Sequence, residues 1–356
     1  MSVYAYMSII EVTLKLAIVY LLSIGNFDKL IFYSILLCVV QIVLSLTYSF
    51  YCIHKFSETH LHFSFDKDIL RDVLSYSGWS LFSSTATSLS NQGAVVLINM
   101  FFSPGIVAAR AIANQVNSAA SQFVNNFRTA ANPQIVKRYA ASDFEGSKSL
   151  LLNSTKFSFF IMLILSLPIC LVAEPLLKLW LGVVPEYSVP FVQLAIITSL
   201  FEVLDTSFYT ALYAKGQIKE NALISPTILF LGFPISYVLF KFSFSPLALA
   251  WVYLIIRIVL GTIIKPLLLI KIVNYKWNDF YTVFIPCLKV LITSLPIPLI
   301  SFFYKDILFC NQIVSFIMLA IIGIISVTLS SWYIGLDRDL RIKGKGIFLD
   351  KIKKKR

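Results

Sequence analysis

Residues 246–270 read PLALAWVYLIIRIVLGTIIKPLLLI, and Arg257 and Lys265 are the only charged side chains in this stretch. A helix needs roughly 20 mostly apolar residues to cross about 30 Å of hydrocarbon, so this stretch is long enough to span a membrane. Similar runs recur along the whole chain, at residues 3–25, 30–53, 76–102, 106–131, 156–174, 188–213, 221–241, 246–270, 281–303 and 312–335. The sequence therefore predicts an all-α integral membrane protein of about ten transmembrane helices.

The composition agrees with a lipid environment. Of the 356 residues, 58% are hydrophobic and 13% are charged, and the mean hydropathy is +0.82. Soluble domains carry roughly 25% charged residues, because each surface helix presents a polar face to water. Residues 1–24 have neither a basic start nor a small-residue cleavage site, so we interpret them as a mature helix rather than a signal peptide.

The basic residues predict the orientation in the membrane. Lys and Arg concentrate in alternate loops, such as 54–75 and 132–155, and in the tail 337–356. Basic loops remain in the cytoplasm, so we expect a multi-pass membrane protein with both termini cytoplasmic. The net charge of +12 follows from this bias. This positive charge predicts contact with the lipid bilayer, and we do not expect a nucleic acid as a partner.

Two neighbouring runs carry a row of polar side chains. At 100° per residue, the polar residues of 106–131 and the residue that follows fall within an arc of roughly 80°: Arg110, Asn114, Asn117, Ser121, Asn125, Arg128 and Asn132. The preceding run repeats the pattern with Ser80, Ser83, Ser84, Thr87, Ser90 and Asn91. Amides and hydroxyls pair with sugar hydroxyls, and the forked guanidinium suits phosphate. The same groups also join membrane helices by hydrogen bonds, but the length of the row favours a water-filled cavity.

Other charged residues lie inside the predicted spans. Glu11 and Lys15 are four residues apart, which favours an ion pair on one helix face; a coupling-ion or substrate site is the alternative. Glu202 and Asp205 lie on one predicted helix, where they either neutralise Arg257 or bind a cation. Glu202, Asp205 and Glu11 are thus candidate ion-coupling residues, and Arg257 and Lys15 are candidate substrate contacts.

The sequence predicts no enzyme, cofactor or metal site. No nucleophile elbow or kinase signature is present. The pair His60-Leu-His62 has no third ligand at a recognisable spacing, so we interpret it as part of a solvated loop.

Two stretches carry a family resemblance. Residues 75–145, which begin SYSGWSLFSSTATSLSNQGAVV, and residues 176–196, LLKLWLGVVPEYSVPFVQLAI, resemble Wzx-type polysaccharide (O-antigen) flippases. These belong to the multidrug/oligosaccharidyl-lipid/polysaccharide exporter superfamily. The resemblance implies two helical bundles around a central cavity that opens alternately to each side. The implied substrate is an undecaprenyl-diphosphate-linked oligosaccharide for lipopolysaccharide biosynthesis, and other polysaccharide-assembly proteins are the implied partners.

The resemblance also suggests which residues meet the substrate. Arg110 and Arg128 would contact the diphosphate or acidic sugars, together with Asn114, Asn117, Ser121, Asn125 and Asn91; Arg257 and Lys15 are less well supported. A multidrug/cation antiporter of the same superfamily is the alternative, and it would need the three acidic residues for cation exchange.

The resemblance implies a division of the chain. The family has six helices before the segment that starts near Tyr76, whereas this chain has two, so the first four would be missing. We expect residues 1–75 to be the remnant of an N-terminal bundle, 76–336 to be a C-terminal bundle of eight helices, and 337–356 to be a basic cytoplasmic tail. A truncated, inactive remnant is a further alternative.

The predicted water-filled cavity can be tested by thiol labelling. In a chain whose own five cysteines are replaced, we expect cysteines at Asn114, Ser121 and Asn125 to react with a membrane-impermeant maleimide. A cysteine at Phe123, on the opposite helix face, is the control and should react much more slowly. Protection of the three polar positions throughout the transport cycle would contradict the cavity.

Overall fold

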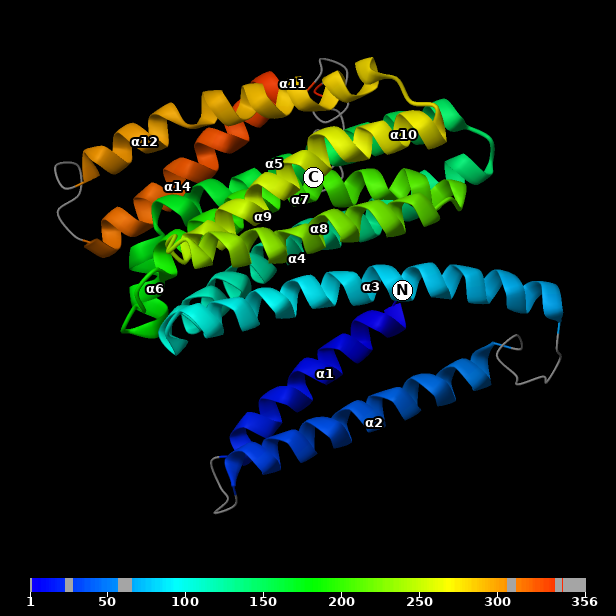
Figure 1. Cartoon of the computed structure of the whole chain (residues 1–356), viewed down its shortest axis with the longest axis horizontal. Coiled ribbons are helices and arrows are strands. Elements are labelled where there is room, and N and C mark those ends of the chain that lie inside the picture. Colours follow the sequence, from blue (N-terminus) through cyan, green and yellow to red (C-terminus); the bar gives the residue numbers. More distant parts are fainter. Residues whose placement is uncertain (1, 23–27, 57–65, 306–311, 337–340, 342–356) are drawn as a thin grey trace, which may run out of the picture. The chain divides into compact units, whose positions relative to one another are not determined.

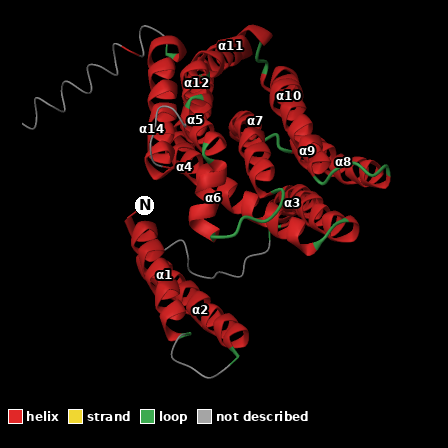
Figure 2. Cartoon of the chain, turned by 90° about the vertical axis from the view of Figure 1, so that its left-hand side faces the viewer, coloured by secondary structure: helices red, strands yellow, loops and turns green. Residues whose placement is uncertain are grey.

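The computed structural model describes residues 2–22, 28–56, 66–305, 312–336 and 341, and contains only helices and short connections in these ranges (Figure 2). The helices are α1 Ser2–Leu21, α2 Lys29–Lys55, α3 Lys67–Phe101, α4 Pro104–Ala140, α5 Phe144–Leu171, α6 Ala173–Leu181, α7 Ser188–Lys215, α8 Lys219–Lys241, α9 Leu247–Val259, η2 Leu260–Ile264, α10 Lys265–Val273, α11 Trp277–Ser294, α12 Pro296–Phe303, α14 Gln312–Ser330 and η3 Ser331–Gly335. The predicted all-α fold is confirmed.

The chain divides into two compact units, Met1–Arg71 and Asp72–Arg356. In the first unit α1 packs against α2. In the second unit α7 is the central helix, because it contacts α4, α5, α6, α9, α10 and η2 (Figure 1). Every residue of the candidate site described below belongs to this second unit.

Each of the ten predicted spans coincides with a helical segment wherever the structure describes it. Seven segments are long and apolar enough to cross a membrane, at Ile31–Lys55, Phe144–Leu171, Ser188–Lys215, Lys219–Lys241, Leu247–Val273, Trp277–Phe303 and Val314–Gly335. The chain is therefore a multi-pass membrane protein. Among the described helices, α1, α3, α4 and the short α6 do not meet this criterion; hydroxyl and amide side chains lower the hydropathy of α3 and α4.

Two of the loops predicted from the sequence are shorter in the structure than expected. The polar segment 132–155 is almost entirely helical, because α4 continues to Ala140 and α5 begins at Phe144. The Asp143 side chain accepts a hydrogen bond from the backbone N–H of Gly146 (2.9 Å) and so caps α5. Similarly, α3 begins before the predicted span, at Lys67. Hydropathy marks where a helix leaves hydrocarbon and not where its hydrogen bonding ends.

Two sequence predictions fall outside the described residues. The pair His60 and His62 lies there, and so does the basic tail 337–356 apart from Arg341.

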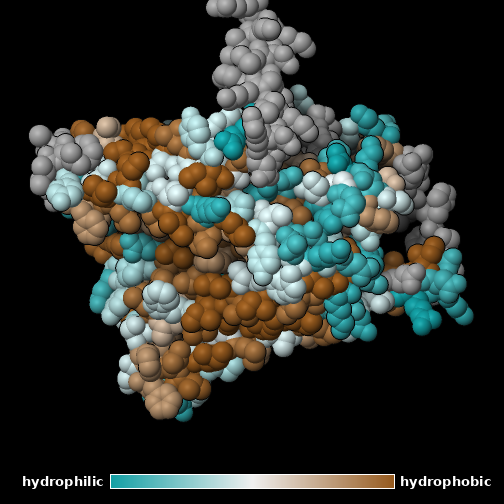
Figure 3. Space-filling model, turned by 90° about the horizontal axis from the view of Figure 1, so that it is seen from above, coloured by the Kyte–Doolittle hydropathy of each residue, from teal (hydrophilic) through white to brown (hydrophobic). Residues whose placement is uncertain are grey.

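The second unit has a packed core and an apolar outer surface. Phe208 of α7 packs edge-on against Phe280 of α11, with ring centroids 5.3 Å apart, and both side chains are fully buried. In contrast, Ile292 of α11 and Ile300 of α12 are each 58% exposed. Figure 3 shows broad apolar areas on one face of the molecule. Such areas are rare on soluble monomers but suit contact with lipid chains.

A single π-helical turn, η2, interrupts the helix that contains α9 and α10. Gly261 lies in this turn, and a Cβ atom built on it would be 2.8 Å from the carbonyl oxygen of Phe201 in α7. The absence of a side chain at Gly261 therefore allows η2 to approach the backbone of α7 closely.

This contact predicts a difference between two glycine substitutions. We expect Gly261→Ala to lower stability by about 1–3 kcal/mol, since overpacking of this size typically costs that much. The control is Gly78→Ala in α3, where a Cβ atom meets nothing within 4 Å and alanine should be neutral or stabilising. Melting of the two detergent-solubilised variants checks this, and equal melting temperatures would contradict it.

Candidate functional site

The second unit holds an ion-pair cluster between α7 and the α9–η2–α10 segment. The two Nη atoms of Arg257 lie 2.9 Å from Glu202 Oε1 and 2.9 Å from Asp205 Oδ2. The Nζ atom of Lys265 lies 3.0 Å from the other oxygen of Asp205. Asp205 and Lys265 are buried, whereas Glu202 is partly exposed. The cluster contains two basic and two acidic residues, so its charges balance.

Local helix geometry brings these four side chains together. Glu202 and Asp205 are three residues apart and share one face of α7. Arg257 and Lys265 are eight positions apart, which in an uninterrupted α-helix would separate their directions by about 80°. The π-helical turn η2 adds the equivalent of one residue, so the offset falls to about 20°. Both basic side chains can therefore reach Asp205.

A polar pocket of about 440 Å³ lies on one side of the cluster. We call it the Arg110 pocket. Its polar lining comes from α3, α4, α7 and α9: Asn91, Gln92, Arg110, Asn114, Asn117, Ser118, Thr198, Glu202, Tyr253 and Arg257. The pocket thus combines guanidinium, amide and hydroxyl groups, which can bind phosphate and sugar hydroxyls.

A second polar pocket of about 500 Å³ also borders the cluster. We call it the Lys265 pocket. Its polar lining comes from α3, α4, α7, α8, α9 and α10: Tyr76, Ser80, Ser83, Ser84, Thr87, Arg128, Glu202, Asp205, Thr206, Tyr209, Asn221, Ser225, Arg257 and Lys265. Four hydroxyl residues of α3 therefore line this pocket, at Ser80, Ser83, Ser84 and Thr87, while Asn91 of the same helix lines the Arg110 pocket.

Arg110 has an unusual environment. Its Nη1 atom is buried without a hydrogen-bond partner, and no carboxylate in the described part of the chain forms an ion pair with it. A buried charge without a counter-ion is costly in a membrane. The Arg110 pocket therefore presents a cationic group that an anionic ligand can neutralise.

The polar row of α4 serves two purposes. Arg128 donates to the Thr206 hydroxyl oxygen (2.8 Å) and to the Thr206 carbonyl oxygen, and Asn117 accepts from Ser199. These are bonds between helices α4 and α7. The same Arg128 and Asn117 also line pockets, so cavity lining and helix-to-helix bonding both occur in this row.

The remaining predicted residues lie elsewhere. Ser121 and Asn125 line neither the Arg110 pocket nor the Lys265 pocket. Glu11 and Lys15 belong to the first unit, where they form an ion pair of 2.6 Å. Glu11, Glu202 and Asp205 are each paired with a basic side chain, so a coupling cation would have to displace that partner.

The role of Lys265 was not predicted from the sequence. This residue donates a hydrogen bond to Asn221 of α8, and its Nζ lies 5.4 Å from the ring centroid of Tyr209. Near the end of a predicted span, a lysine is expected to extend toward the membrane surface. The π-helical turn that redirects Lys265 has no recognisable sequence pattern, so no signal was available.

Ser90 was predicted only as one of several hydroxyls, but it joins three helices. Its Oγ lies 2.8 Å from the Tyr253 Oη of α9 and 3.0 Å from the Leu229 carbonyl oxygen of α8. Ser90 is 1% exposed. It therefore attaches the middle of α3 to Tyr253, which lines the Arg110 pocket, and to Leu229, which lines the Lys265 pocket.

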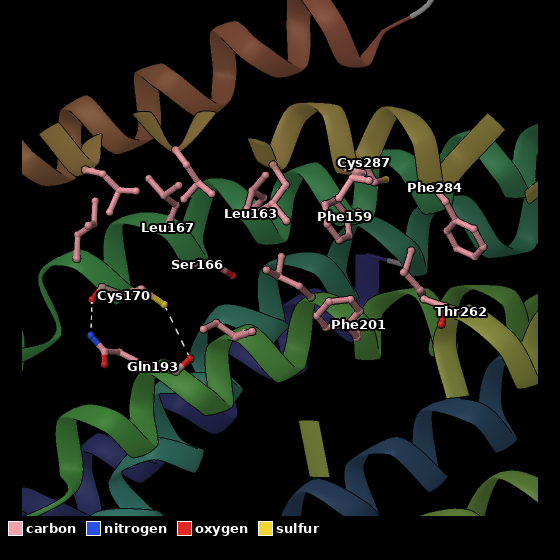
Figure 4. A pocket seen from close by; sticks show the side chains of 18 of the residues that line it. Phe159, Leu163, Ser166, Leu167, Cys170, Gln193, Phe201, Thr262, Phe284 and Cys287 are labelled. Carbon is pink, nitrogen blue, oxygen red and sulfur yellow. Dashed lines mark hydrogen bonds between the residues drawn. The ribbon is translucent and has the colours of Figure 1, made fainter. Parts of the chain in front are cut away.

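A third pocket, of about 790 Å³, has a different chemistry. It is lined mainly by apolar side chains of α5, α7, α11 and α12, such as Phe159, Leu163 and Phe201 (Figure 4). Gln193 is a polar exception, and its amide donates to the Cys170 carbonyl oxygen (2.9 Å). This pocket suits hydrocarbon and offers little to a sugar or a phosphate.

A helical membrane protein with charged and polar interior pockets has the general design of a transporter. The comparisons with known families agree. The family described as "Polysaccharide biosynthesis protein" matches residues 1–139, and the family described as "MatE" matches residues 80–238. Together the two matches place the chain in the polysaccharide and multidrug exporter superfamily. No curated protein and no solved structure matches the chain.

The cluster predicts a specific pattern of stabilities. We expect Asp205→Asn to destabilise the protein by about 3–5 kcal/mol, because it leaves Lys265 buried without its counter-ion. Adding Lys265→Met should recover much of this loss, since Arg257 keeps Glu202 as its partner. Unfolding free energies of the single and double variants in detergent check this. Additive losses in the double variant would contradict the pairing.

Proposed function

We propose that this protein is a Wzx-type flippase that carries an undecaprenyl-diphosphate-linked oligosaccharide across the bacterial inner membrane for surface polysaccharide biosynthesis. In this proposal both termini are cytoplasmic and the substrate moves from the cytoplasmic to the periplasmic leaflet. No chemical reaction accompanies this movement.

The observation that carries the proposal is the unpaired guanidinium of Arg110 in a polar pocket. Arg110 has no carboxylate partner among the described residues, and Asn91, Asn114 and Asn117 surround the same space. A diphosphate supplies the missing negative charge, and the amides can bond to sugar hydroxyls. Both parts of a lipid-linked glycan headgroup therefore find complementary groups in one pocket.

The balance of charge favours an anion over a cationic drug. Arg110, Arg128, Arg257 and Lys265 line the two polar pockets, against the acidic residues Glu202 and Asp205. Both acidic residues are already ion-paired. A cation exchanger needs carboxylates available for its ligand, so we favour the glycan flippase over the multidrug antiporter.

Export in the native host tests the proposal. We expect Arg110→Gln in the complete gene to reduce surface polysaccharide about tenfold or more, since a hydrogen bond to a charged group contributes roughly 1.5–3 kcal/mol. The control is Arg138→Gln, because Arg138 is exposed and lines neither polar pocket. Membrane insertion of both variants is measured by immunoblotting of membranes.

Two outcomes would contradict the proposal. One is normal export from an inserted Arg110→Gln variant. The other is a gene deletion that leaves surface polysaccharide unchanged and raises sensitivity to cationic dyes, which would support the antiporter.

A further inference from the structure

The Glu202–Arg257 pair lies where the two polar pockets meet. Both residues line the Arg110 pocket, and both also line the Lys265 pocket. The other two members of the cluster, Asp205 and Lys265, line only the Lys265 pocket. A ligand that passes from one pocket to the other therefore meets Glu202 and Arg257.

The two acidic residues of the cluster differ in exposure and in the number of their ion-pair partners. The Asp205 side chain is 6% exposed and has two basic partners, Arg257 and Lys265. The Glu202 side chain is 34% exposed, and among the described residues its one ion-pair partner is Arg257. Asp205 is thus a fixed part of the packed structure. Glu202 can separate from Arg257 and still be surrounded by polar groups.

Arg257 can exchange one anion for another. Its guanidinium already bonds to Asp205 through one Nη atom and to Glu202 through the other. Guanidinium binds both carboxylate and phosphate oxygens through its forked N–H donors. A phosphate group can therefore take the position of the Glu202 carboxylate while Asp205 continues to hold Arg257 in place.

The released carboxylate would remain in a polar environment. Glu202 lines the Arg110 pocket together with the amides of Asn91, Gln92 and Asn114. Amide N–H groups donate to carboxylates, so displacement does not require Glu202 to enter hydrocarbon. This lowers the cost of the exchange.

We propose that Glu202 is a resident counter-ion of Arg257, which occupies the anion position between the two pockets until a phosphate of the substrate displaces it. The identity of that substrate as a prenyl diphosphate rests on the function proposed above. Glu202 thereby sets selectivity, because only an anion that binds Arg257 better than the attached carboxylate can occupy the junction. Monovalent anions compete poorly with a tethered carboxylate, whereas a diphosphate carries several charges.

Binding of a short prenyl diphosphate tests the proposal. The full chain is reconstituted in lipid nanodiscs, and affinity for radiolabelled farnesyl diphosphate is measured. We expect Glu202→Gln to bind it about tenfold tighter or better than the unmodified chain, because the competing charge is gone. In the double variant with Arg257→Gln this gain should disappear.

Glu145→Gln is the matched control. It also removes one negative charge, but Glu145 pairs with Lys148 and lines neither polar pocket. Its affinity should equal that of the unmodified chain. If Glu145→Gln increased the affinity for farnesyl diphosphate as much as Glu202→Gln does, the effect would be due to net charge and the proposal would be wrong.

Carboxyl labelling of the unmodified chain provides a measurement that does not depend on a variant folding. We expect farnesyl diphosphate to increase the reaction of Glu202 with a water-soluble carbodiimide, while Asp205 stays protected. Unchanged labelling of Glu202, equal or weaker binding by a folded Glu202→Gln variant, or no binding by either protein would each overturn the proposal. Failure of the export function is recognised separately, by normal surface polysaccharide after gene deletion.

Discussion

The site is held together by the ion pairs that buried Asp205 forms with Arg257 and Lys265. Charges in a membrane are tolerated only when they are paired or hydrated, and both basic residues come from the segment that faces α7. The pairing requires α7 and η2 to lie close together, which Gly261 permits. The same contact separates the polar interior into two pockets that share Arg257 and Glu202.

The polar face of α4 shows how one helix combines structure with recognition. Arg128 bonds to Thr206 and Asn117 bonds to Ser199, so the positions of α4 and α7 are set by side chains that also border the pockets. Arg110 near the start of the helix has no such bond. Within this row, Arg128 and Asn117 therefore hold α4 against α7, whereas the Arg110 guanidinium remains available to bind an anion.

The described interior has more basic than acidic side chains around its pockets, and this excess lies at Arg110 and Arg128 rather than in the balanced cluster. Arg128 is stabilised by hydroxyl and carbonyl oxygens, which are neutral acceptors. An interior of this kind attracts anions and disfavours cations. This electrostatic preference supports the proposed export of a phosphate-bearing lipid.

The class of fold and the chemistry of the interior could be predicted from the amino-acid sequence alone. Long apolar runs require helices in hydrocarbon, and helical periodicity placed Arg110, Asn114 and Asn117 on one face, where the structure lines one pocket with them. Which charged side chains pair with one another depends on tertiary packing and could not be predicted. Arg257 and Lys265 converge on Asp205 through a π-helical turn, whose position depends on packing against α7 and leaves no periodic pattern in the sequence.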